Sequence, residues 1–109
     1  MDIKQIFIAA NQALAAGSYR EFLTYCSDDI RWERVGEKIL NGKVELLEYI
    51  GTAYDGLTFT TERYIREENF LVELGEIVFD KNGKSKKNSY CDIWNFRDGL
   101  IHQVKSFVI

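Results

Sequence analysis

The residues of this sequence best suited to move a proton are Glu73, Asp92 and the only histidine, His102. Asp92 stands two positions from Tyr90 on one side and from Trp94 on the other. A carboxyl group on such an apolar face is hard to ionise, and two neighbouring carboxyls can share one proton. A histidine beside a carboxylate can titrate near neutral pH. This pattern predicts general acid or base chemistry, with these three residues as the catalytic candidates.

Four residues are candidates for binding a small molecule, namely Trp32, Arg34, Tyr90 and Trp94. Aromatic walls suit a flat organic ligand, and a guanidinium can hold an anionic substituent or pair with an acid. Several of the candidates have a plainer alternative. The tryptophans can belong to the core, Arg34 can end a strand in solvent, and His102 can lie at the rim of a sheet.

The first half of the chain has the periodicity of helices. One apolar stripe at helical spacing, followed by a stop at Gly17, comprises Ile3, Ile6, Phe7, Ala10 and Leu14. A second helix after Ser18 has one face made of Tyr19, Phe22, Leu23 and Cys26. A third, between Asn41-Gly42 and Asp55-Gly56, carries Val44, Leu46, Leu47, Ile50 and Tyr54.

Alternating apolar and polar residues predict strands elsewhere. The predicted strands cover residues 30–35, 58–66, 70–80, 86–96 and 100–108. The strand 70–80 is apolar on both faces. One face can line a pocket while the other needs cover, so the sequence predicts a homodimer through the outer face of the sheet.

Two turns set the facing of these strands. Asn82-Gly83 is typical of a two-residue type I′ hairpin, which places Asp92 directly opposite Glu73 and Tyr90 opposite Gly75. An aromatic ring can then cover the bare glycine.

The second turn, at residues 97–99, is predicted to be a three-residue loop with Gly99 in a G1 bulge. Asp92 then faces the pocket opposite Val104, and His102 lies across from Trp94. The alternative, a two-residue turn, would pair Asp92 with Lys105 on the outside.

Composition limits the class of protein. The chain has 109 residues, 46% of them hydrophobic, which suits a single domain over residues 1–109. Its net charge of -3 comes from intermixed charges and argues against nucleic acid as a partner. No export signal or membrane span is evident, so a cytoplasmic location is expected. Cys26 and Cys91 have no metal-ligand spacing and are predicted to be buried thiols, and neither a metal nor another cofactor is indicated.

The order of helices followed by a long antiparallel sheet resembles the nuclear transport factor 2-like superfamily, and within it the SnoaL-like and ketosteroid isomerase-related domains. The segments that carry the resemblance are residues 25–32, 41–43 and 92–101. It implies an α+β cone, a curved antiparallel sheet wrapped around three N-terminal helices that encloses a pocket, with the acid at Asp92 pointing inward. It also favours a two-fold dimer.

The chain departs from the reactions known in these relatives. Ala10 and Arg34 occupy the places that match a tyrosine donor and an aspartate base of ketosteroid isomerase. The arginine-x-aspartate pair of limonene epoxide hydrolase and the histidine-aspartate arrangement of scytalone dehydratase are not evident either. The sequence therefore predicts an acid/base isomerase, cyclase, dehydratase or hydrolase acting on a small hydrophobic or cyclic molecule. The alternatives are a non-catalytic ligand-binding protein and a dimeric interaction module.

Overall fold

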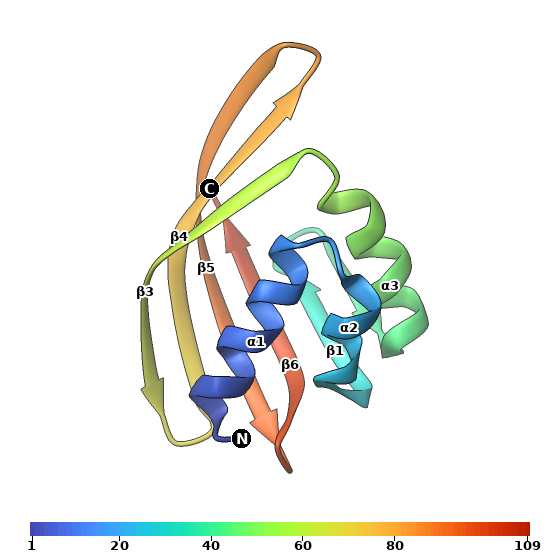
Figure 1. Ribbon diagram of the computed structural model, residues 1–109, viewed down its shortest axis with the longest axis vertical. Coiled ribbons are helices and arrows are strands. Elements are labelled where there is room, and N and C mark those ends of the chain that lie inside the picture. Colours follow the sequence, from blue (N-terminus) through green and yellow to red (C-terminus); the bar gives the residue numbers. More distant parts are fainter.

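Over the part of the chain that the structure describes, three helices cover one face of a six-stranded sheet (Figure 1). The structure is a computed structural model that describes residues 1–109, apart from the side chain of residue 81. The helices are α1 (Ile3–Ala15), α2 (Tyr19–Thr24) and α3 (Gly42–Ala53). The strands are β1 (Cys26–Arg34), β2 (Lys38–Asn41), β3 (Leu57–Glu67), β4 (Phe70–Lys81), β5 (Lys84–Arg97) and β6 (Leu100–Val108). The sheet is curved and does not close on itself, which confirms the predicted α+β cone.

Helix α1 begins with a capping box, in which Asp2 and Gln5 exchange backbone-to-side-chain hydrogen bonds of 2.9 Å. It buries the predicted stripe from Ile6 to Leu14 against the sheet. In α3 the predicted face is only partly right. Leu46 is buried, but Val44 is 75% exposed because its side chain leaves the first turn of the helix toward solvent.

The strands lie in the order β2-β1-β6-β5-β4-β3. All neighbours are antiparallel except β1 and β6, which are parallel. Strand β1 begins at Cys26 rather than at the predicted residue 30, and β2 was not predicted. Both features depend on pairing: Ile101 at the start of β6 donates a backbone hydrogen bond of 2.8 Å to Tyr25 just before β1. Such long-range pairing leaves little trace in local periodicity.

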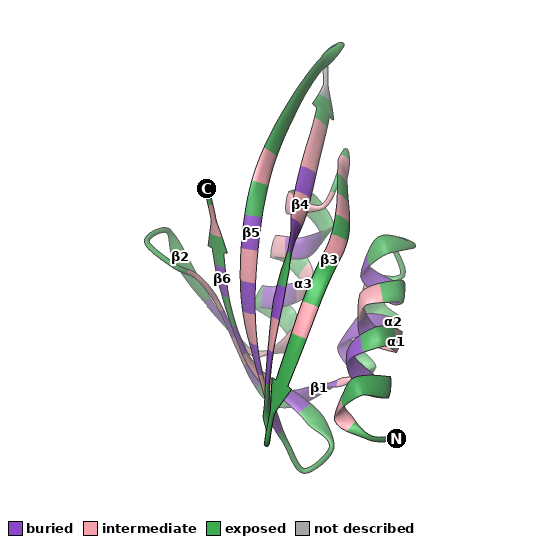
Figure 2. Ribbon diagram, turned by 90° about the vertical axis from the view of Figure 1, so that its left-hand side faces the viewer, coloured by how far each residue is buried: buried purple, intermediate pink, exposed green. Residues whose placement is uncertain are grey.

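The β4–β5 hairpin forms as predicted. Asn82 and Gly83 have φ angles of 55° and 74°, as a type I′ turn requires. The predicted register follows, with Gly75 opposite Tyr90. A Cβ atom built on Gly75 would come within 2.6 Å of the Tyr90 ring, so the ring does cover the glycine. The far end of this hairpin projects beyond the other strands, and residues 82–87 there are exposed (Figure 2).

The predicted turn between β5 and β6 was wrong in type. Asp98 and Gly99 both have positive φ angles, 52° and 75°, so the loop has two residues and no G1 bulge. The extra residue lies instead inside β6, because the pairing shifts between Phe96 with Ile101 and Asn95 with Gln103. A bulge in the strand restores the same facing as a longer loop would have given. Asp92 therefore still faces inward, opposite Ser106 rather than Val104 or Lys105.

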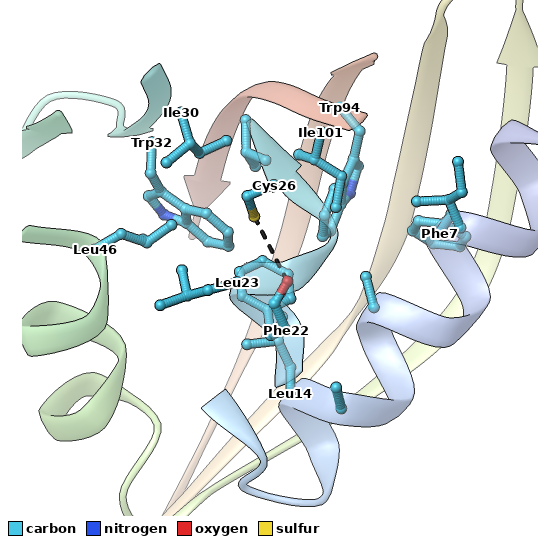
Figure 3. Close-up of a cluster of buried hydrophobic side chains, with 14 of the residues drawn as sticks. Phe7, Leu14, Phe22, Leu23, Cys26, Ile30, Trp32, Leu46, Trp94 and Ile101 are labelled. Carbon is cyan, nitrogen blue, oxygen red and sulfur yellow. Dashed lines mark hydrogen bonds between the residues drawn. The ribbon is translucent and has the colours of Figure 1, made fainter. Parts of the chain in front are cut away.

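An aromatic cluster lies in the buried core between the helices and the sheet (Figure 3). The ring centroids of Trp32 and Trp94 lie 6.1 Å apart in an edge-to-face arrangement, and Phe22 packs against both. Such contacts add about 0.5–1.5 kcal/mol each to the burial of apolar area. Cys26 is buried as predicted, and burial raises the pKa of its thiol to about 12, whereas Cys91 is half-buried.

None of the helices described has the length and apolar character needed to span a bilayer.

Candidate functional site

A row of polar side chains crosses the inner face of the sheet. Arg34 pairs with Ser106, Ser106 with Asp92, and Asp92 with Glu73, on the four adjacent strands β1, β6, β5 and β4. The next inward-facing row toward the narrow end is apolar and consists of Trp32, Val104, Trp94 and Leu71. The polar row therefore marks the level at which the packed core gives way to a cavity.

The cavity has a volume of about 300 Å³ and is lined by α1, α3 and five of the strands. The polar row and the two tryptophans lie along its wall. Apolar residues from β3 and β4 complete it, namely Leu57, Phe59, Ile77 and Phe79. A mostly apolar lining with a few convergent polar groups is typical of a site for a small organic ligand.

Glu73 is only 1% exposed, and its carboxyl accepts four hydrogen bonds. Its Oε2 atom accepts from Asn11 Nδ2 at 3.1 Å, from Thr61 Oγ1 at 2.5 Å and from the Tyr90 hydroxyl at 2.6 Å. Its Oε1 atom accepts from Trp94 Nε1 at 3.2 Å. The donors come from α1, β3 and β5, so this carboxyl ties three elements together.

Asp92 is almost as deeply buried, at 7% exposure, but its Oδ1 atom has no hydrogen-bond partner among the residues described. The pKa of Asp92 is raised to about 7, and burial is the largest cause. The Ser106 hydroxyl and the Arg34 guanidinium oppose this rise, whereas the Glu73 carboxylate adds to it. An aspartate with a pKa near 7 can both donate and accept a proton at physiological pH.

Arg34 lies at the edge of this row with its side chain 28% exposed. Its Nε atom is 3.5 Å from Glu37 Oε2, and its Nη1 atom donates to the Tyr49 hydroxyl oxygen at 3.5 Å. Within the part of the chain that the structure describes, Arg34 and Asp92 make no ion pair shorter than 4.0 Å. The guanidinium therefore influences Asp92 through its charge at a distance.

Two tyrosines of the α3 region, Tyr49 and Tyr54, line the cavity on the side opposite the sheet. Burial raises the pKa of Tyr54 well above its ordinary value, and the charge of Asp92 raises it further. Tyr54 thus keeps its proton and remains a hydrogen-bond donor. The sequence placed Tyr54 on the helix only as an apolar residue. The residue type already indicated a possible hydrogen-bond donor, but the position of Tyr54 at the cavity depends on how α3 lies across the sheet.

A profile of the SnoaL-like domain family matches residues 7–104 of the chain. The chain belongs to the SnoaL-like domain family. This confirms the resemblance inferred from the sequence. A comparison with curated protein sequences finds no match.

Solved structures share the fold of this SnoaL-like domain. A nuclear transport factor 2-like protein of unknown function from Cytophaga hutchinsonii is 24% identical, with a TM-score of 0.82 over 99% of this chain and 100% of that chain. TerC, co-crystallised with polyporic acid, is 13% identical, with a TM-score of 0.84 over 94% and 87%. A proposed ketosteroid isomerase from Kribbella flavida is 16% identical, with a TM-score of 0.85 over 96% and 76%. At these identities the similarity shows the fold alone.

His102 lies outside the cavity of the SnoaL-like domain, contrary to the prediction. It is the extra residue of the bulge in β6, so it does not lie across from Trp94. Its Nδ1 atom is 3.7 Å from Asp29 Oδ1, and the same oxygen accepts a hydrogen bond of 2.7 Å from Arg97. Local sequence could not reveal this placement, because a loop residue and a strand bulge restore the register equally well.

The other predicted residues of the SnoaL-like domain lie together around the cavity, with different surroundings. Trp32 and Trp94 belong to the aromatic core and also line the cavity floor. Tyr90 lines the cavity too, but its hydroxyl is already donated to Glu73. Among the residues that the structure describes, no group of histidine, cysteine, aspartate and glutamate side chains could hold a metal ion.

Proposed function

We propose that this SnoaL-like domain is an acid/base enzyme that moves a proton within a small hydrophobic or cyclic molecule. The observation that carries the proposal is the carboxyl of Asp92, which is buried, borders the cavity and has one oxygen without a partner among the described residues. The pKa near 7 suits a group that takes a proton in one step and returns it in the next.

The surroundings favour isomerisation or cyclisation through an enol over the other predicted reactions. Both need one group that removes a proton beside a carbonyl and returns it elsewhere. Glu73 is engaged by four donors, so Asp92 is the carboxyl left for this task. Tyr54 supplies a protonated phenol that can stabilise the developing oxyanion.

The test uses 2-tetralone, a flat cyclic ketone with acidic hydrogens beside its carbonyl. Exchange of these hydrogens for deuterium is followed by proton NMR with and without the protein. We expect catalysed exchange that falls by roughly 10²- to 10⁴-fold in Asp92→Asn, the range typical of a lost general base. Exchange no faster than in buffer, or equal exchange in the variant, would contradict the proposal.

A second candidate is a protein that binds a ligand without changing it. The observation in its favour is Arg34, which borders the cavity and whose side chain makes two long polar contacts with the residues that the structure describes. If binding is the whole function, Asp92→Asn retains affinity for the natural ligand and no deuterium exchange is seen in the wild type. Mass spectrometry of metabolites that co-purify with the protein would identify that ligand.

We also propose that the domain is a homodimer through the outer face of its sheet. Phe107, Cys91 and Leu74 form one row across β6, β5 and β4 on that face, and Ile93 with Val72 forms part of the next. Phe107 and Leu74 are 39% and 40% exposed, an apolar area that a second copy would cover. We expect a dimer mass by light scattering at micromolar concentration and a monomer for Leu74→Lys. A monomeric wild type would refute this assembly.

A further inference from the structure

Arg34 and Tyr49 form a pair of hydrogen-bond donors at one side of the cavity. Arg34 Nη1 donates to the Tyr49 hydroxyl oxygen at 3.5 Å, so the proton of that hydroxyl is free to be donated elsewhere. The second contact of Arg34, to Glu37 at 3.5 Å, is also long, and the Glu37 side chain is 60% exposed. A guanidinium has five N–H donors, so these two contacts leave most of them without a partner in the described part of the chain.

The charge around Tyr49 is positive on two sides. The Lys38 ammonium lies 5.7 Å from the centroid of the Tyr49 ring, and Arg34 lies at its hydroxyl. A cation near the ring and a cation at the oxygen both favour donation by the phenol to an anion. A carboxylate matches the fork of N–H groups on a guanidinium and accepts an O–H as well.

Arg34 and Asp92 are separated by one strand, β6, and by the Ser106 side chain in the same row. Strands in a sheet are roughly 5 Å apart, so the two backbone positions are about 10 Å from each other. If Arg34 held the carboxylate of a ligand, a carbon atom about one ring away from that carboxylate would therefore lie near Asp92. The body of such a molecule would lie against Phe59 and the other apolar residues that line the cavity.

We propose that the ligand of this cavity is a flat cyclic carboxylic acid, with its carboxylate bound by Arg34 and Tyr49 and its reacting atoms turned toward Asp92. This inference rests on the proposed function, because it reserves Asp92 for the chemistry. It adds the chemical class of the substrate and two residues that select it.

The test compares 2-naphthoate with its neutral amide, 2-naphthamide. Quenching of the fluorescence of Trp32 and Trp94, which line the cavity, reports binding. We expect the wild type to bind the acid roughly tenfold more tightly or better than the amide, as hydrogen bonds to charged groups usually give. Equal affinities, or binding of neither molecule, would overturn the inference.

Variants show which residues cause the preference for the acid over the amide. Arg34→Gln should remove the preference for the acid, and Tyr49→Phe should reduce it by a smaller factor. The matched control is Arg31→Gln, the same substitution on the same strand, at a residue that pairs with Glu33 and does not line the cavity. A preference that survives in Arg34→Gln, or that is lost equally in Arg31→Gln, would refute the assignment.

Measuring the affinity at two pH values tests how close the bound carboxylate lies to Asp92. The charged and titratable side chains that line the cavity together with Asp92 are Arg34, Glu37, Tyr49, Tyr54, Glu73 and Tyr90. Above pH 7 the negative charge of Asp92 competes with the bound carboxylate for the positive charge of Arg34. The affinity for 2-naphthoate should therefore fall, and this fall should be absent in Asp92→Asn. Affinity independent of pH in the wild type would place the carboxylate away from Asp92 and refute the pose. The exchange reaction of neutral 2-tetralone needs no carboxylate, so it can succeed while this inference fails, or the reverse.

Discussion

Glu73 and Asp92 are direct neighbours on the inner face of the sheet, and both are buried, yet their surroundings differ. Four donors from three elements converge on Glu73. Asp92 borders the cavity, has one oxygen without a hydrogen-bond partner among the described residues, and has a raised pKa. Depth alone therefore does not distinguish a reactive carboxyl from a structural one. The distinction is whether the protein itself satisfies the oxygens.

The two carboxyls also differ in what surrounds them in the fold. The donors of Glu73 tie α1 and β3 to the centre of the sheet, whereas Asp92 borders the space between the sheet and α3. One side of the inner face is thus a stabilising junction and the other is an open site. The following predictions test this division, beginning with the largest effect.

Glu73→Leu should lower the free energy of unfolding by about 3 to 5 kcal/mol, because it leaves buried donors without an acceptor. Urea denaturation measures the change. The matched control is Glu76→Leu on the same strand, where the half-buried carboxyl makes a surface ion pair of 3.2 Å with Lys87. That control should change stability by about 1 kcal/mol or less. Similar losses in both variants would mean that Glu73 is not a junction.

Asp92→Asn, unlike Glu73→Leu, should raise the free energy of unfolding at high pH. The pKa of Asp92 rises from 3.8 to about 7 on folding, so the folded state binds the proton more tightly. The wild type should lose stability as the pH rises from about 4 to about 7, by an amount on the order of 3 kcal/mol. Asp92→Asn carries no such charge and should be more stable than the wild type at pH 8. The exposed Asp28, changed to Asn, should leave the pH dependence intact; a wild type equally stable at pH 5 and pH 8 would contradict the raised pKa.

Gly75→Ala should lower the free energy of unfolding by about 1 to 3 kcal/mol, because the added atom overcrowds the surroundings of Glu73. Its Cβ atom would clash with the Thr60 carbonyl oxygen and the Tyr90 ring, whose hydroxyl donates to Glu73. Gly51→Ala in helix α3 is the control, because a Cβ atom there meets nothing within 4 Å. That change should stabilise by about 0.5–1 kcal/mol. Thermal unfolding of both variants measures the difference, and a neutral Gly75→Ala would show that Tyr90 is free to move.

Glu73→Gln should lower the pKa of Asp92, because the carboxylate of Glu73 disfavours a second negative charge nearby. Burial is the larger cause, so the pKa should stay above 3.8. An NMR titration of the Asp92 carboxyl in the wild type and in the variant measures the shift. An unchanged midpoint would show that the two carboxyls are electrostatically independent.

His102→Gln should change affinity for 2-naphthoate by less than about twofold, because His102 contacts Asp29 outside the cavity. Fluorescence titration checks this value. A tenfold loss of affinity would mean that His102 belongs to the site and that the site is not centred on the two carboxyls.

Part of the site could be predicted because it depends on local chemistry. A two-residue turn at Asn82-Gly83 sets the register of two long strands, and that register alone places Asp92 opposite Glu73. Helical periodicity likewise identified the buried stripe of α1. The resemblance to a known family added the cone and the inward direction of the acid.

Only the tertiary structure decided what surrounds the two carboxyls. The parallel pairing of β1 with β6 brings Arg34 into the row, and the crossing of α3 brings Tyr49 and Tyr54 to the cavity. The bulge at His102 removes the histidine from it. These contacts join residues far apart in the chain, and their geometry follows from strand pairing and helix packing, which residue type and spacing do not encode. By itself the sequence determined which acids face each other, while the fold decided which of them has its oxygens hydrogen-bonded by the described residues.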